Sequence, residues 1–138
     1  ENSETVIFKD FAHSPSKVSA TTKAVSEQYK NRTLIACLEL HTYSSLNAEF
    51  LSEYHGALDA ADKAVVFYSP HAVEIKQLEQ VSKAQIANAF QRDDLLIFTN
   101  PKEFHDFLFG QDLKSTALVL MSSGNYGGLD FEKLKSLI

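Results

Sequence analysis

The chain has 138 residues, 44% of them hydrophobic and 22% charged, which suits one globular domain with a proper core. Its formal net charge of -5 and the lack of any lysine or arginine run argue against nucleic acid or a membrane as partner, so we expect a small polar metabolite. No apolar run approaches the ~20 residues of a membrane span, and the start does not resemble a signal peptide. We therefore expect a cytoplasmic protein.

The cysteine content and the lack of a phosphate-binding loop further limit what kind of protein this chain can be. The single cysteine, Cys37, excludes an internal disulfide and lies in an apolar run, so we expect it to be buried and inert. The chain begins at Glu1, without a methionine, and contains no G-x-x-x-x-G-K-S/T loop, the usual phosphate cradle of an ATP-using enzyme. We expect the chain to be one piece of a longer protein.

Five short, nearly continuous apolar runs, bounded by polar turns, are typical of buried parallel strands. They are residues 5–8, 34–38, 64–68, 95–98 and 117–121. Segments with helical spacing follow each of them, at residues 16–30, 49–58, 82–90, 101–109 and 129–138. Such alternation predicts one domain, residues 1–138, with a Rossmann-like α/β fold: a mostly parallel, doubly wound sheet with helices on both faces. For residues 73–81, a loop, an edge strand or a helix start all remain open.

Polar residues gather in the loops after four of the predicted strands. Because these loops share the carboxyl edge of a parallel sheet, residues far apart in the sequence can converge there on one ligand. The residues of interest are Asp10 and His13; His41, Tyr43 and Ser44; Ser69 and His71; and the glycine loop at 122–128.

Each of these candidates also has a plain structural interpretation. Asp10 could bind a ribose hydroxyl or cap a turn, and His13 could contact a phosphate or an incoming nucleophile or simply belong to the turn. The glycine loop could collect an anion or need glycine for a tight turn. Ser69 and His71 could line a polar pocket or lie in a solvated turn.

The five histidines do not show the spacing of a recognised metal-binding motif. His13, His41 and His71 could form a three-histidine zinc site, although their spacing does not require one, and we predict no metal ligands in this chain. His55 and His105 fall within predicted helices and are expected at the surface.

Three motifs resemble one enzyme family. Residues 10–15, Asp-Phe-Ala-His-Ser-Pro, resemble the D-Y-A-H-x-P motif that opens the C-terminal domain of the Mur ligases. Residues 39–45, Glu-Leu-His-Thr-Tyr-Ser-Ser, resemble the Q-P-H-R-Y-T-R pattern of the alanine-adding member, and residues 122–127 resemble the last glycine loop. The similarity runs from about residue 4 to the end and is greatest to the murein peptide ligase branch of the family.

The resemblance implies an activity for the longer protein. Mur ligases of this branch are ATP-dependent amide ligases that join the tripeptide L-Ala-γ-D-Glu-meso-diaminopimelate to UDP-N-acetylmuramate in peptidoglycan recycling. ATP and Mg²⁺ would form an acyl phosphate, and an amine of the tripeptide would attack it. A central domain with the P-loop and metal ligands, and an N-terminal domain, would lie elsewhere in the same chain. This domain would close over the site, and would not be active alone.

The resemblance also implies roles for particular residues. It implies that His13 is catalytic and faces the reaction centre, and that the nucleotide is contacted by Asp10, Phe11 and Ser14. The substrate-binding positions are His41, Thr42, Tyr43, Ser44, Ser45, Ser69, His71, Ser123, Gly124 and Asn125. Thr42 and Ser45 stand where the alanine-adding pattern has arginines, which would clamp a small carboxylate. Their replacement indicates a longer substrate that is held differently.

A second interpretation stays open. The chain could be a stand-alone Rossmann-like module that binds a nucleotide or an anion without catalysis. An upstream reading frame containing a G-K-S/T loop would favour the ligase, whereas a stop or a linker there would favour the module.

Overall fold

The computed structural model describes residues 5–10, 15–40, 52–68, 83–92, 94–111, 115–122, 126 and 129–136. The strands are β1 (Thr5–Asp10), β2 (Thr33–Glu39), β3 (Lys63–Phe67), β4 (Leu96–Phe98) and β5 (Thr116–Met121). The helices are α1 (Pro15–Gln28), α4 (Lys83–Phe90), α5 (Pro101–Phe109) and α6 (Phe131–Lys135), with a 3-10 turn, η2 (Ser52–Tyr54).

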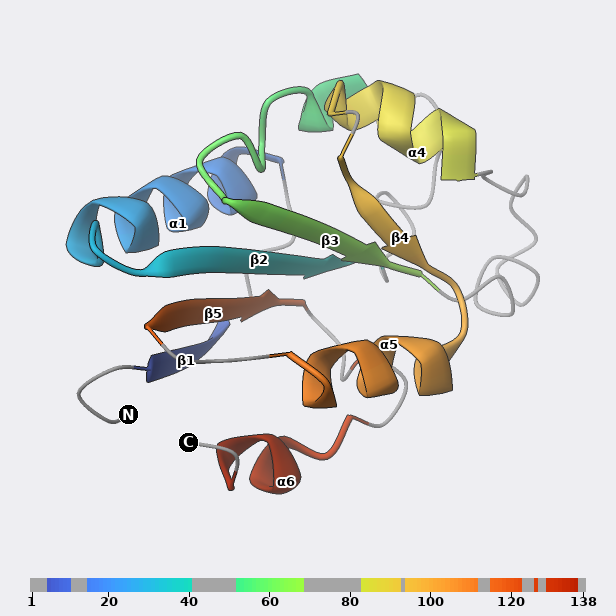
Figure 1. Ribbon diagram of the computed structural model, residues 1–138. Helices are drawn as coiled ribbons and strands as arrows, with labels where there is room; N and C mark the ends of the chain where they lie inside the picture. Colours follow the sequence, from blue (N-terminus) through green and yellow to red (C-terminus); the bar gives the residue numbers. More distant parts are fainter. Residues whose placement is uncertain are drawn as a thin grey trace.

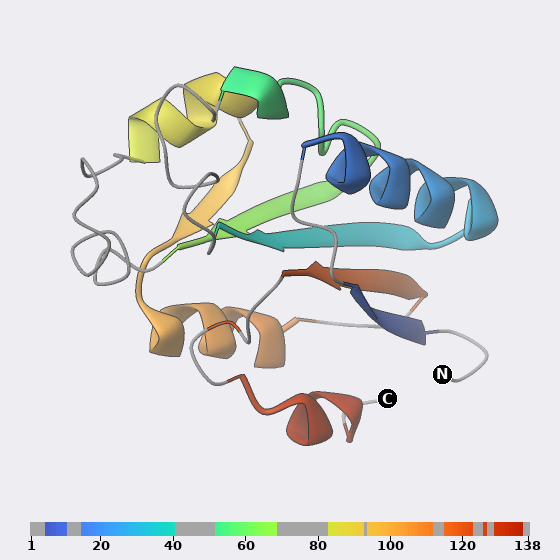
Figure 2. The ribbon, with the colours of Figure 1, turned by 180° about the vertical axis from the view of Figure 1, so that it is seen from behind.

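The five strands form one parallel sheet in the order β1-β5-β2-β3-β4. β5, the last strand in the chain, therefore lies between the first two. Figures 1 and 2 show α1, η2 and α4 on one face of the sheet and α5 and α6 on the other. This arrangement confirms the predicted Rossmann-like α/β fold with helices on both faces.

Each face of the sheet has its own apolar core. Alternate residues of a strand point to opposite faces, so Leu34, Ala36 and Leu38 of β2 pack under α1 and η2, while Ile35 and Cys37 pack against α5 and α6. Burial of Cys37 confirms the prediction for the thiol and raises its pKa. β2, β3 and β5 are buried on both faces, which explains why their sequences are continuous apolar runs.

The helix boundaries follow from local chemistry. α1 begins at Pro15, whose missing N–H costs nothing in the first turn, and it buries Val18, Thr22 and Val25, which recur every three or four residues. The side chain of Asn100 caps α5 by accepting hydrogen bonds from two backbone N–H groups of its first turn. Asp130 caps α6 by accepting one hydrogen bond, from the backbone N–H of Lys133.

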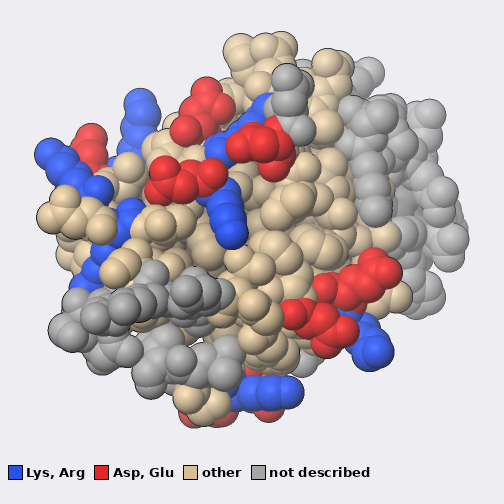
Figure 3. All heavy atoms as spheres, in the orientation of Figure 1, with Lys and Arg blue, Asp and Glu red and all other residues tan. Residues whose placement is uncertain are grey.

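Two predicted helices differ from the observed elements. In the segment predicted as a helix at 49–58, the described residues form only η2 and the turns that follow, because Gly56 adopts a φ of 76° that does not continue a helix. The last helix is shorter than the predicted 129–138 because its cap is Asp130. Within the described ranges, none of the helices combines the length and the apolar character needed to cross a membrane. Figure 3 shows acidic and basic side chains interspersed on the face in view.

Candidate functional site

The chain leaves neighbouring strands toward opposite faces on both sides of β5. It leaves β1, β2 and β3 toward the face covered by α1, η2 and α4, but it leaves β4 and β5 toward α5 and α6 on the opposite face (Figure 1). Open α/β sheets bind ligands in the crevice left where the loops at the carboxyl ends of neighbouring strands diverge in this way. The carboxyl ends of β1, β5 and β2 are therefore the candidate site.

A buried carboxylate lies at this point. Glu39 ends β2 and is only 4% exposed. Its Oε1 accepts a hydrogen bond of 2.5 Å from the hydroxyl of Ser122, directly after β5, and one of 3.0 Å from the backbone N–H of Tyr126. One carboxylate oxygen thus bonds both ends of the segment 122–126. Charge-assisted hydrogen bonds of this kind are about twice as strong as neutral ones.

Tyr126 is the centre of a second set of contacts. Its hydroxyl lies 2.9 Å from the carbonyl oxygen of Cys37 and 2.8 Å from that of Met121, both of which can only accept its hydrogen. Its ring stacks on Phe104 of α5 at 5.1 Å. Burial, and then the neighbouring Cys37 and Glu39, hold the pKa of the phenol well above its usual value, so the hydroxyl remains a donor.

His105 of α5 completes this arrangement. Its Nε2 lies 2.9 Å from the carbonyl oxygen of Tyr126, and because a carbonyl only accepts, Nε2 carries the hydrogen. His105, which we expected at the surface, is half-buried, and its ring contacts the backbone carbonyl of Tyr126. His55 is exposed as predicted, but it lies in a turn after η2 rather than in a helix.

Asp10 provides an exposed acid at the same edge. It is the last residue of β1, and its backbone carbonyl accepts a hydrogen bond of 2.9 Å from the N–H of Ser122. The carboxylate therefore stands beside the end of β5, one strand away from Glu39. The exposed carboxylate of Asp10 can accept hydrogen bonds from a ligand, whereas the described contacts of Glu39 are internal.

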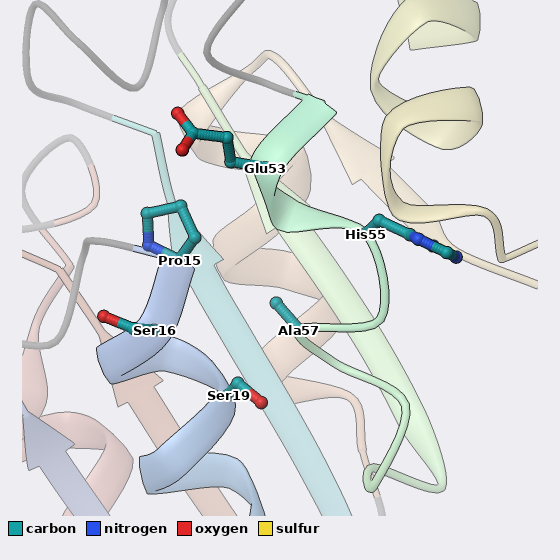
Figure 4. A pocket seen from close by; sticks show the side chains of 6 residues that line it. All are labelled: Pro15, Ser16, Ser19, Glu53, His55 and Ala57. Carbon is teal, nitrogen blue, oxygen red and sulfur yellow. The ribbon is translucent and has the colours of Figure 1, made fainter.

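A hollow of about 390 Å³ opens nearby, between the start of α1 and the turn of η2. Figure 4 shows its lining, with the Ser16 and Ser19 side chains on α1 and those of Glu53, His55 and Ala57 on and after η2. Pro15 closes one end. Hydroxyl and carboxylate side chains lie along the hollow, whereas the ring of His55 points away from α1 in Figure 4. Among the residues that the structure describes, no group of three or more His, Cys, Asp or Glu could hold a metal ion.

Comparison with known proteins shows which enzymes this chain resembles. The chain is 27% identical over 126 residues to a UDP-N-acetylmuramate–L-alanine ligase of Sulfurihydrogenibium sp., covering 90% of this chain and 27% of the relative. It superposes on a murein peptide ligase of Psychrobacter arcticus with a TM-score of 0.74 and 19% identity, over 97% of this chain and 28% of that one. The chain is a relative of the Mur ligases. Its fold is that of their C-terminal domain.

A third comparison involves a domain of similar size. The chain superposes with a TM-score of 0.63 and 20% identity on a crystallised domain from Haemophilus ducreyi, described as part of a UDP-N-acetylmuramate:L-alanyl-gamma-D-glutamyl-diaminopimelate ligase. The match covers 98% of this chain and 93% of that domain. This Mur ligase relative spans about a quarter of the length of the curated relatives that it matches. No family model matches the chain.

The structure describes only part of the predicted Mur ligase site. Asp10 lies at the carboxyl edge, as predicted, although it ends β1 rather than lying in the loop after it. The other site predictions lie outside the described residues: Phe11, His13, Ser14, His41, Thr42, Tyr43, Ser44, Ser45, Ser69, His71, Ser123, Gly124 and Asn125. Their places in the sequence put them after β1, β2, β3 and β5. Their roles stay predictions.

The sequence analysis did not single out Glu39, Tyr126 or His105 as site residues. A signal for Glu39 was present, because a lone carboxylate between Leu38 and Leu40 continues an otherwise apolar strand. Charged residues are almost never fully buried unless they are paired, so an acid in such a run predicts a partner. No comparable signal marked Tyr126 and His105, which meet only through the packing of α5.

Proposed function

We propose that this chain is the C-terminal domain of a cytoplasmic, ATP-dependent amide ligase of peptidoglycan recycling. The ligase joins L-Ala-γ-D-Glu-meso-diaminopimelate to UDP-N-acetylmuramate. The observation that carries the proposal is the fold shared with a murein peptide ligase over 97% of the chain. The change from arginine at Thr42 and Ser45 supports it, because a longer peptide needs the space that two guanidinium groups would fill.

In this proposal the domain contacts the nucleotide through Asp10, together with Phe11 and Ser14. An exposed carboxylate at the end of a parallel strand fits a ribose, because it can accept hydrogen bonds from both hydroxyls. ATP supplies the driving force by activating the muramyl carboxylate. We propose that Mg²⁺ and most of the triphosphate are held by a central domain in the same protein, and that His13 faces the reacting groups.

The main test is ligation by the longer protein. Purified full-length protein, given ATP, Mg²⁺ and UDP-N-acetylmuramate, is expected to consume the tripeptide with a higher kcat/KM than L-alanine. The 138-residue chain alone serves as the control and is expected to show no turnover. A preference for L-alanine would assign the alanine-adding reaction instead, and no ATP-dependent ligation with either amine would favour a binding module.

Asp10→Ala tests the nucleotide contact. In the full-length protein the change is expected to raise the KM for ATP about tenfold and to leave the melting temperature unchanged, because the side chain is exposed. Asp106→Ala on α5 is the matched control, since it removes an exposed acid from the opposite face. An unchanged KM for ATP together with a lower melting temperature would make Asp10 a structural cap.

Thr42→Arg combined with Ser45→Arg tests the choice of peptide. The two guanidinium groups would occupy space and offer a clamp for a small carboxylate. We expect kcat/KM for the tripeptide to fall roughly thirtyfold, or about 2 kcal/mol, with little change in the KM for ATP. Kinetics with the tripeptide varied at saturating ATP measure this. A double variant with wild-type kcat/KM would place this loop away from the peptide.

A further inference from the structure

Asp10 is the last residue of an edge strand. β1 lies at one end of the strand order, so it pairs with β5 along one side. The burial of β1 falls along its length, from Thr5 and Val6, which are buried, to Lys9 and Asp10, which are exposed. Strand ends with few buried contacts open more readily than the centre of a sheet. The placement of the Asp10 carboxylate therefore depends on how the end of β1 is held.

The end of β1 is bonded to Ser122. The N–H of Ser122 donates a hydrogen bond of 2.9 Å to the backbone carbonyl oxygen of Asp10. Ser122 directly follows Met121, the last residue of β5, so it lies where the regular pairing of that strand ends. Any shift of Ser122 therefore acts directly on the backbone of Asp10.

Glu39 holds Ser122 from the other side of β5. Glu39 ends β2, which lies on the opposite side of β5 from β1. Its Oε1 accepts a hydrogen bond of 2.5 Å from the Ser122 hydroxyl, and the two residues are 4% and 5% exposed. Charge-assisted hydrogen bonds are strong, and buried networks of them specify one arrangement. The ends of β1, β5 and β2 are thus joined through Ser122.

Tyr126 adds support at the same place. Its hydroxyl lies 2.8 Å from the carbonyl oxygen of Met121, the residue before Ser122. Its backbone N–H donates to the same Oε1 of Glu39 that Ser122 bonds. Its φ of 55° is unfavourable for a bulky side chain, and such strain persists only where the surroundings over-determine it. The end of β5 is therefore fixed at two successive residues.

We propose that Glu39 and Ser122 are positioning residues for the nucleotide. They hold the end of β1 so that the exposed carboxylate of Asp10 meets the ribose hydroxyls in one arrangement, and they act through Asp10 rather than by touching the nucleotide. Apolar residues of similar volume are often as stabilising as a buried charged group, so the stability of the sheet does not require a carboxylate at position 39. This inference rests on the nucleotide contact in the proposed function.

The KM for ATP of single and double variants of the full-length protein tests the inference. Glu39→Ala alone is expected to raise this KM about fivefold, because Ser122 loses its acceptor. In the Asp10→Ala background the same change is expected to raise it less than about twofold, since the carboxylate that Glu39 positions is already absent. Glu39→Gln, whose amide oxygen can accept both bonds, is expected to stay within about twofold of the wild type.

Leu34→Ala is the control for lost stability. Leu34 is buried near the opposite end of the same strand, so this change is expected to lower the melting temperature and leave the KM for ATP unchanged. If Glu39→Ala behaves like Leu34→Ala, Glu39 is structural and the inference is wrong. An equal rise in KM with and without the Asp10 carboxylate would also overturn it, because Glu39 would then act by another route.

Two further outcomes are decisive. If Glu39→Ala does not fold, Ser122→Ala takes its place, with an expected rise in the KM for ATP of about threefold that disappears in the Asp10→Ala background; a rise that persists there contradicts the inference. A wild-type protein that binds ATP but ligates no amine contradicts the proposed function alone, and the same comparison made with the Kd for ATP then decides the inference.

Discussion

The two edges of the sheet are held by charged side chains in different ways. At the carboxyl edge, Glu39 is buried and its Oε1 bonds the segment after β5. At the amino edge, Arg92 donates to the carbonyl oxygens of Leu58 and Asp62 and pairs with Asp94, whose side chain is 66% exposed. Both charges join segments distant in the chain. Arg92 has one buried partner, Leu58, and one exposed partner, Asp94, whereas the described partners of Glu39 are all buried.

This difference shows that the free-energy cost of losing a hydrogen bond depends on whether the groups left behind are exposed to water. If Arg92 is removed, water can hydrate the carbonyl of Asp62 and the carboxylate of Asp94 at the surface. If Glu39 is removed, a buried hydroxyl and a buried N–H lose their acceptor, and each unsatisfied group costs about 1–3 kcal/mol. The carboxyl edge is therefore the more sensitive of the two, and it is also the edge that carries the candidate site.

The largest expected effect is that of Glu39→Ala on stability. We expect the free energy of unfolding of the 138-residue chain to fall by about 3 kcal/mol, and by about 1 kcal/mol for Glu39→Gln, which keeps an acceptor. Urea titration of the 138-residue chain measures both losses. Equal losses for the two variants would show that the charge, and not the acceptor, is what the site requires.

A smaller, pH-dependent effect is expected for Tyr126→Phe. At pH 7 the loss of the hydroxyl should cost about 1–2 kcal/mol. The raised pKa keeps the phenol protonated in the folded state, whereas the unfolded state ionises near pH 10 and then binds fewer protons. The wild type therefore loses stability above about pH 10 relative to the variant.

Urea titrations of both proteins at pH 7, 9 and 11 measure this effect. The stability difference is expected to be the same at pH 7 and 9 and smaller at pH 11. The raised pKa values of Cys37, Tyr54 and Tyr68 occur in both proteins and largely cancel in the comparison. A difference that stays constant to pH 11 would show that Tyr126 ionises equally in the folded and unfolded states.

The smallest effects are expected at the amino edge. Arg92→Met keeps the apolar stem and should cost about 1 kcal/mol, because two carbonyl oxygens lose a donor. Asp94→Asn should leave the melting temperature unchanged, since exposed ion pairs contribute little. The hydrogen bond from Arg92 lowers the pKa of Asp94, so any contribution is present at neutral pH and is lost in acid, below about 4. A larger loss for Asp94→Asn than for Glu39→Gln would reverse the comparison of the edges.

The sequence by itself determined the architecture and indicated the resemblance to the Mur ligases. Parallel strands buried on both faces must be apolar throughout, so runs such as 34–38 and 117–121 marked the sheet directly. Pro15 marked the start of α1 through its fixed φ and missing N–H. The motif at 10–15 indicated the Mur ligases, and it placed Asp10 at the edge where the structure has it.

Only the tertiary structure decided how that edge is built. The strand order, with β5 between β1 and β2, brings Glu39 next to Ser122, 83 positions away in the chain. Local residue propensities cannot predict such a contact, because the contact forms only when β5 lies between β1 and β2. The same holds for His105 and Tyr126, which meet because α5 and the segment after β5 cover the same face. Pairing across the sheet forms only in the packed chain. It gives the buried carboxylate of Glu39 its hydrogen-bond partners.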